Sequence, residues 1–131
     1  MKIYTSYFAK IKKMKEHFPY GLCVVSIAQK DPGPEFSANS CKKLAPPWYV
    51  LKAYKENGDK EQYIRDYKRL VLDNIDPHKV YEAFKQRAGY GDIVLVCYEK
   101  SGDFCHRHII AQWLRDAGYE AEEWVEPNET R

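Results

Sequence analysis

The sequence predicts an α/β fold, namely a three-layer, Rossmann-like domain with a mainly parallel sheet and helices on both faces. Runs of strand length alternate along the chain with amphipathic helical segments, which is the pattern of βαβ units. Residues 92–98, DIVLVCY, are almost continuously apolar, as in a strand covered on both faces. With 131 residues the chain can build one core, and we expect a single domain over residues 1–131.

The first quarter of the chain predicts a strand, a helix and a second strand. Residues 2–7 are short and alternating, as expected for the first strand. Residues 22–28, LCVVSIA, are apolar and β-branched, which is typical of an interior strand. Between these strands we expect an amphipathic helix, because four apolar residues recur at helical spacing: Phe8, Ile11, Met14 and Phe18.

Residues 29–46, QKDPGPEFSANSCKKLAP, show no clear period and are rich in Pro, Gly, Ser and Asn. We expect a long loop here. Loops of this length in a compact domain are often lids or binding loops, and the alternative is a plain surface insertion.

Three helices are predicted next. The first begins at Pro47 and ends before Gly58. The second covers residues 61–73, where the apolar side chains share one face. The third begins with Asp76 as N-cap and Pro77 in the first helical position.

The last third predicts strand, helix and strand. Residues 92–98 form the clearest strand of the chain, and residues 121–125 form a short final one. The helix between them carries a strong apolar stripe, made by Ile109, Ile110, Trp113, Leu114 and Ala117.

The composition is that of an ordinary globular protein, with 44% hydrophobic and 31% charged residues. A net charge of only +2 argues against a protein that wraps duplex nucleic acid. Charge is uneven, however: residues 1–43 carry eight Lys against three acids, and residues 116–131 carry one Arg against six acids. The basic part could attract a phosphate-bearing ligand, or it could be a solvated face.

The sequence shows neither a secretion signal nor an apolar run long enough for a membrane span, so we expect a cytoplasmic location and no membrane partner. In a reducing compartment, cysteines serve as buried thiols, metal ligands or reactive groups more often than as a disulfide framework. We expect this of all four: Cys23, Cys41, Cys97 and Cys105.

The stretch 97–107, CYEKSGDFCHR, is the densest in reactive side chains, and it runs from the end of a strand into a helix. Ligands of parallel sheets bind at the carboxyl ends of the strands. A thiol in the first turn beside a cation is biased toward thiolate. We therefore expect Cys105 as nucleophile or thiolate stabiliser, His106 in proton transfer, Glu99 as an orienting or acid/base carboxylate, and Arg107 holding an anion in bidentate fashion.

Other strand ends should meet the same crevice. They predict a binding site for a small anionic ligand, phosphorylated or nucleotide-like, with no cofactor or oligomeric state indicated. The expected ligand-binding residues are Thr5, Ser6, Tyr7, Ser26, Cys97 and Arg107.

Each assignment has an alternative. Cys97 could simply be buried as a small hydrophobe, and Arg107 could pair with Glu99 or Asp103 to fix the loop. No metal site is expected, because paired CxxC or HxxxH spacing is absent. The alternative to an enzyme is a non-catalytic module for nucleic acid or protein, using the basic N-terminal helix and the long loop.

The segments VLVCYEK, CHRHIIAQWL, IYTSYF, LAP and EQYIRDY together resemble the domain of unknown function 488 family. The resemblance implies a small bacterial, archaeal or phage α/β protein whose cysteine, histidine and arginine signature marks an active or ligand site. In many members the first strand runs into a Gly-His-Ser-like turn. This chain has Thr5-Ser6-Tyr7-Phe8 there, so it lacks a histidine at that turn.

Overall fold

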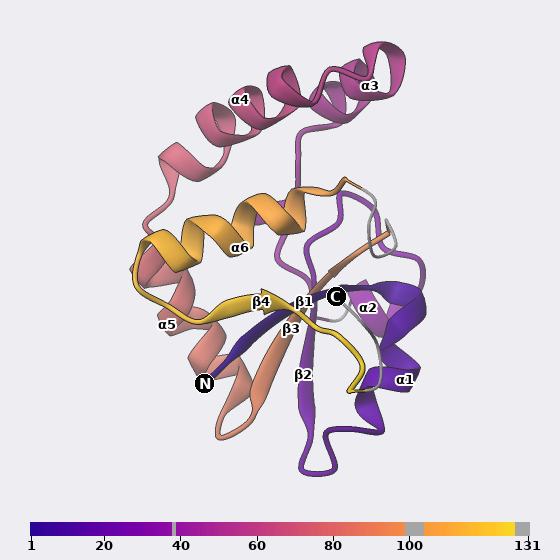
Figure 1. Cartoon of the computed structure of the whole chain (residues 1–131), viewed down its shortest axis with the longest axis vertical. Coiled ribbons are helices and arrows are strands. Elements are labelled where there is room, and N and C mark those ends of the chain that lie inside the picture. Colours follow the sequence, from indigo (N-terminus) through magenta and orange to yellow (C-terminus); the bar gives the residue numbers. More distant parts are fainter. Residues whose placement is uncertain (38, 99–103, 128–131) are drawn as a thin grey trace.

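The computed structural model describes residues 1–37, 39–98 and 104–127, and it confirms the three-layer α/β fold. Four strands form an all-parallel sheet in the order β2-β3-β1-β4 (Figure 1). Their bounds are β1 Ile3–Tyr7, β2 Leu22–Ser26, β3 Asp92–Cys97 and β4 Ala121–Glu123.

Strand β3 lies inside the sheet, between β2 and β1, and its residues 93–97 are all buried. This burial on both faces is the reason for the continuous apolar run that predicted the strand. The parallel register brings Tyr7 opposite Cys97, and Ser26 opposite Val96. The carboxyl ends of β1, β2 and β3 therefore meet at one edge of the sheet.

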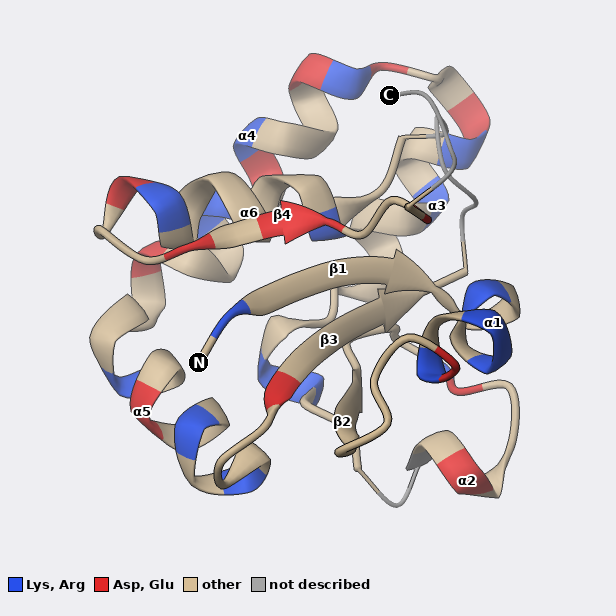
Figure 2. Ribbon diagram, turned by 60° about the horizontal axis from the view of Figure 1, so that its bottom comes forward, with Lys and Arg blue, Asp and Glu red and all other residues tan. Residues whose placement is uncertain are grey.

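Helices cover both faces of the sheet. In Figure 2, α5 and α6 lie on one side of the strands, and α1 and α2 lie on the other. Helices α3 and α4 pack together beyond α6 (Figure 1). The bounds are α1 Ile11–Lys15, α2 Pro34–Ser37, α3 Trp48–Asn57, α4 Lys60–Leu70, α5 Pro77–Ala88 and α6 His106–Asp116, with the 3-10 helices η1 Phe8–Lys10, η2 Lys42–Leu44 and η3 Leu72–Asn74.

The predicted helix starts and stops agree with the structure in their chemistry. Asp76 caps α5 by accepting a hydrogen bond from the His78 backbone N–H at 2.9 Å. Gly58 ends α3 with a φ of 66°, a left-handed conformation that glycine adopts without strain.

Residues 29–46 are more ordered than the expected loop, because they contain α2 and η2. The segment also runs beside β2: Ser26 and Ser40 form a parallel bridge, and the Cys41 N–H donates to the Ser26 carbonyl at 2.8 Å. Short helices of this kind lack the apolar period that reveals longer ones, so a search for periodicity misses them.

Two apolar clusters stabilise the layers. The larger joins the sheet to α3 through α6, and it includes Tyr67 and Phe84. The smaller joins Val94 and Val96 on the other face to Met14 of α1 and to Trp124. Within the described residues, no helix has the length and apolar composition needed to cross a membrane.

Candidate functional site

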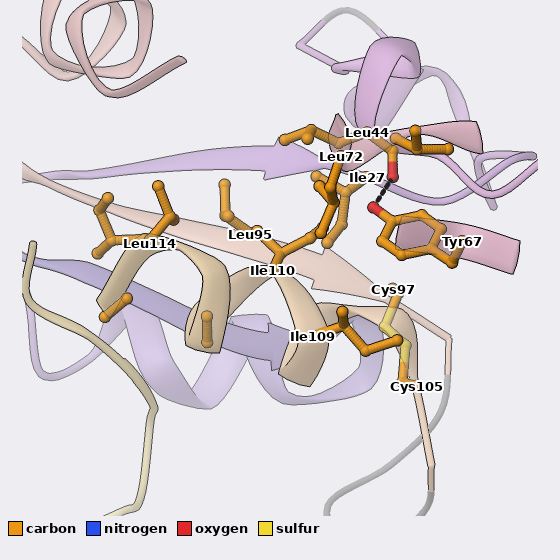
Figure 3. Packing of buried hydrophobic residues seen from close by; sticks show 14 of the residues in the cluster. Ile27, Leu44, Tyr67, Leu72, Leu95, Cys97, Cys105, Ile109, Ile110 and Leu114 are labelled. Carbon is orange, nitrogen blue, oxygen red and sulfur yellow. Dashed lines mark hydrogen bonds between the residues drawn. A yellow bond between two sulfur atoms is a disulfide. The ribbon is translucent and has the colours of Figure 1, made fainter. Parts of the chain in front are cut away.

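Two cysteine sulfurs meet at the carboxyl edge of the sheet. Cys97 is the last residue of β3, and Cys105 is the N-cap of α6. The structure joins them in a disulfide (Figure 3). This corrects the expectation of free thiols, and only Cys23 and Cys41 are free cysteines. The connection from β3 has to return α6 onto the sheet, so its two ends come together although eight positions separate them in sequence.

His106 is held next to this sulfur pair by the neighbouring strand. Its Nε2 lies 2.7 Å from the carbonyl oxygen of Ile27, just beyond β2. A carbonyl oxygen only accepts hydrogen bonds, so Nε2 carries the proton and Nδ1 has the lone pair. Nδ1 lies 3.5 Å from Cys105 Sγ. Burial lowers the pKa of His106 to about 4, with the charge of Arg107 adding to the effect, so the ring is a neutral proton acceptor at physiological pH.

Arg107 is the largest fully buried side chain of the described residues, with 0% exposure. Its Nε and Nη2 donate to the Glu123 carboxylate at 3.0 and 2.9 Å, and its Nη1 donates to Cys97 Sγ at 3.1 Å. The Tyr7 ring lies 5.8 Å from the guanidinium carbon. The cation thus contacts the sulfur of Cys97, whereas the sequence placed it beside Cys105.

This geometry favours the ion-pair role of Arg107 over the binding of an external anion. Glu123 also accepts a hydrogen bond from the Thr5 hydroxyl at 2.7 Å, so one carboxylate links β1 to α6. The expected partners Glu99 and Asp103 lie outside the described residues, and Glu99 therefore receives no role from the structure.

The remaining expected ligand-binding residues line the same edge, but their side chains are engaged or buried. Ser26 donates its hydroxyl to the Asp31 carboxylate, and Ser6 is 1% exposed. Tyr7 is half-buried. None of the buried side-chain nitrogen and oxygen atoms in the described parts of the chain lacks a hydrogen-bond partner. These groups are therefore committed to the fold.

A family model, DUF488-N3a, described as the active DUF488-N3 subclade, matches residues 25–118. The chain belongs to the DUF488 family. The matched span contains Cys97, Cys105, His106 and Arg107, whereas Glu123 lies beyond it. Neither the curated proteins nor the solved structures contain a match to this chain.

Sequence reasoning missed Glu123, the carboxylate that neutralises Arg107 in this DUF488 chain. A usable signal existed, because Glu123 falls inside the predicted strand 121–125. Parallel pairing with β1 places it opposite Thr5, at the same edge as the cysteines. A charged residue in a strand next to a buried arginine is a natural partner, but neither the burial nor the pairing order is visible in one sequence.

Two hollows lie near the site. A small one of about 20 Å³ is lined by Cys105 and His106 together with aromatic residues, including Tyr54 and Phe104. It has room for about one water molecule. A second, of about 830 Å³, lies along α5 and is lined by several basic side chains. Only the small hollow reaches the cysteine pair, and it does so from the side of Cys105.

Proposed function

We propose that this DUF488 chain carries out thiol–disulfide chemistry at the carboxyl edge of its sheet, with Cys97 and Cys105 cycling between dithiol and disulfide. The observation that carries the proposal is the pairing of each sulfur with a group suited to its reduced form. Arg107 Nη1 donates to Cys97 Sγ, and His106 Nδ1 faces Cys105 Sγ. A disulfide that serves only as a staple needs neither a cation nor a base beside it.

The two groups have distinct roles. When an external thiolate attacks Cys105 Sγ, the S–S bond breaks and Cys97 leaves as a thiolate. Arg107 then stabilises that thiolate by a charge-assisted hydrogen bond. In the oxidising direction, His106 Nδ1 accepts the proton of the Cys105 thiol, because the ring is neutral. Cys105 and His106 line the small hollow, so the attack comes from their side.

The expected cytoplasmic location is part of this proposal. In reducing compartments disulfides are transient, and they are usually catalytic or redox-sensing. A buried pair flanked by His106 and Arg107 agrees with that use. In an oxidising compartment, the same pair would be a permanent crosslink.

A redox titration tests the proposal. The chain is equilibrated with glutathione buffers of increasing oxidation, the thiols are trapped by alkylation, and Cys97 and Cys105 are counted by peptide mass spectrometry. We expect a reversible two-electron transition with a midpoint above roughly −300 mV, the level below which structural disulfides lie. The double variant Cys23→Ser/Cys41→Ser is the matched control and should show the same midpoint. A pair that stays oxidised throughout would contradict the proposal.

A second candidate function is the binding of a small phosphorylated or nucleotide-like ligand, and a different observation favours it. The 830 Å³ groove along α5 is lined by four cations against one carboxylate, Asp76. Its volume is that of a small-molecule site. The cations are Lys42, Lys43, Lys79 and Arg87.

Calorimetric titration with a nucleoside diphosphate tests this second function. We expect binding that weakens with salt and falls about tenfold or more in a Lys79→Ala/Arg87→Ala variant. The matched control is Lys12→Ala/Lys15→Ala on α1, outside the groove. Binding of an oligonucleotide through Lys12 and Lys15 would instead support the nucleic-acid alternative.

A further inference from the structure

The atoms of Cys97, Cys105 and His106 that could bind a metal form a compact cluster. The two sulfurs and one imidazole nitrogen all lie within 4.8 Å of one another, and all three residues are buried. They come from the end of β3 and the beginning of α6. The missing CxxC spacing, on which the expectation of no metal rested, is replaced here by a chain reversal.

We propose that in the reduced protein these three residues bind one Zn²⁺ ion, and that formation of the Cys97–Cys105 disulfide releases it. Thiolate and imidazole are the donors that zinc prefers. This inference rests on the proposed function, because both require the dithiol form of the pair.

The contacts around the cluster orient the donors as a metal site requires. His106 Nε2 donates to the Ile27 carbonyl, so the lone pair of Nδ1 points to the sulfurs. Histidine ligands of metals almost always donate their other nitrogen in this way, which fixes the ring and its tautomer. Arg107 Nη1 provides the corresponding hydrogen bond to Cys97 Sγ.

Charge balance also favours a divalent ion. Two thiolates and a neutral imidazole offset the charge of Zn²⁺, and Arg107 is already neutralised by Glu123 at 2.9 Å. The loaded cluster therefore has no net charge. A buried site needs such compensation, because an uncompensated ion in a protein interior costs several kcal/mol or more.

Three protein donors leave the fourth position of a tetrahedral zinc ion open. The hollow lined by Cys105 and His106 has a volume of about 20 Å³, which is enough for about one water molecule. The fourth ligand is therefore water or a small molecule that replaces it.

Oxidation releases the metal without changing its charge. The thiolates of Cys97 and Cys105 attack glutathione disulfide in two exchange steps, an S–S bond forms between them, and two glutathione thiolates leave. The two electrons pass to glutathione, while Zn²⁺ has no redox chemistry and only loses its ligands. The sulfurs joined in the disulfide no longer act as thiolate donors.

Metal loading of the full chain tests the inference. The protein is reduced with a phosphine under argon, exposed to Zn²⁺, passed through gel filtration and analysed for metal. We expect about one Zn²⁺ per chain in the reduced form and almost none after treatment with glutathione disulfide. Co²⁺ in place of Zn²⁺ should give thiolate-to-metal charge-transfer absorption in the reduced form alone.

Matched variants locate the site. His106→Gln should weaken Zn²⁺ binding at least about tenfold, and Cys105→Ser should weaken it about a hundredfold. Cys23→Ser/Cys41→Ser should bind as the wild type does. Because a buried substitution can unfold the chain, a wild-type measurement accompanies them: Zn²⁺ should protect Cys97 and Cys105 from alkylation, and a chelator should remove the protection.

The outcomes separate the two proposals. Reduction that yields alkylatable Cys97 and Cys105 without Zn²⁺ uptake would overturn the metal site and leave the thiol chemistry standing. Zinc binding that disappears in the Cys23→Ser/Cys41→Ser variant would also overturn the metal site. A pair that cannot be reduced in the folded chain would overturn both.

Discussion

Two polar networks lie at the same edge of the sheet, one after β2 and one after β3, and they differ in burial. After β2, Asp31 accepts from the Ser26 hydroxyl and pairs with Lys42 at 3.1 Å, and the Lys42 side chain is 48% exposed. After β3, Arg107 pairs with Glu123 and Cys97, and its side chain is 0% exposed. The strands end side by side, yet only the second network is sealed.

The difference shows what burial does to similar chemistry. An exposed ion pair contributes little to stability, because water screens both charges. A buried pair may add no net stability over an apolar replacement, but removing one partner is expensive because the other charge remains in the interior. The β3 network therefore tolerates change least, and it is also the network that contacts the reactive sulfurs.

Glu123→Gln should have the largest effect. The variant leaves the Arg107 guanidinium buried without a counter-charge, and we expect a loss of about 3 kcal/mol, at the low end for a broken buried pair because Glu123 is 20% exposed. Urea denaturation measures it. Glu126→Gln, which affects a pair with the exposed Lys13, is the control and should cost less than about 1 kcal/mol. Equal losses in the two variants would remove the contrast between buried and exposed networks.

Reduction of the Cys97–Cys105 disulfide should have the next largest effect. The bond closes a short loop, with a sequence separation of eight, and chain entropy alone predicts a loss of about 2 to 3 kcal/mol. Thermal unfolding with and without reductant measures it. The Cys23→Ser/Cys41→Ser variant should show the same drop, and a chain whose midpoint does not respond to reductant would argue that the bond constrains nothing.

Tyr67 is a third buried polar group, next to His106, and it sharpens the comparison because it is neutral. Its hydroxyl donates to the Leu44 carbonyl at 2.6 Å (Figure 3), and Tyr67→Phe should cost about 1 to 2 kcal/mol. Burial raises the pKa of Tyr67 well above its ordinary value of 10.0. Above that pH the unfolded chain loses this proton while the folded chain retains it, so the unfolding free energy should fall as pH rises.

Urea denaturation at neutral pH and near pH 10.5 separates the two effects of Tyr67. The wild type should lose more stability between these conditions than Tyr67→Phe does. Tyr90→Phe, at a fully exposed ring, is the control and should behave as the wild type. An equal alkaline loss in all three chains would show that Tyr67 does not retain its proton.

Lys42→Met should have the smallest effect, below about 1 kcal/mol in urea denaturation, because the Lys42–Asp31 pair is open to water on the lysine side. Raising the salt concentration should reduce the difference between variant and wild type further. A loss as large as that of Glu123→Gln would mean that exposure does not distinguish the two networks.

The fold could be predicted from the sequence because its signals are local. The apolar run of β3, the stripe of α6 and the Asp76-Pro77 cap each lie within a few residues. The position of the site could also be predicted, since parallel strands place their carboxyl ends together. Both statements need no knowledge of which side chains touch.

The contacts within the site could not be predicted, because they depend on pairing order and burial. Glu123 reaches Arg107 only because β4 pairs with β1, and Cys105 reaches Cys97 only because the chain reverses between β3 and α6. The tautomer of His106 depends on a carbonyl of Ile27, 79 positions away in sequence. Spacing rules for cysteines and acids report neighbours along the chain, and these partners are neighbours in space.

The most direct test of the proposed thiol chemistry compares two rates in the folded protein. Cys97 and Cys105 are 1% and 3% exposed, so a purely structural disulfide would be reduced only when the chain unfolds. We predict that dithiothreitol reduces the pair in the native chain much faster than the chain unfolds globally, by way of the hollow at Cys105. A reduction rate that equals the global unfolding rate, and follows it in urea, would contradict the account.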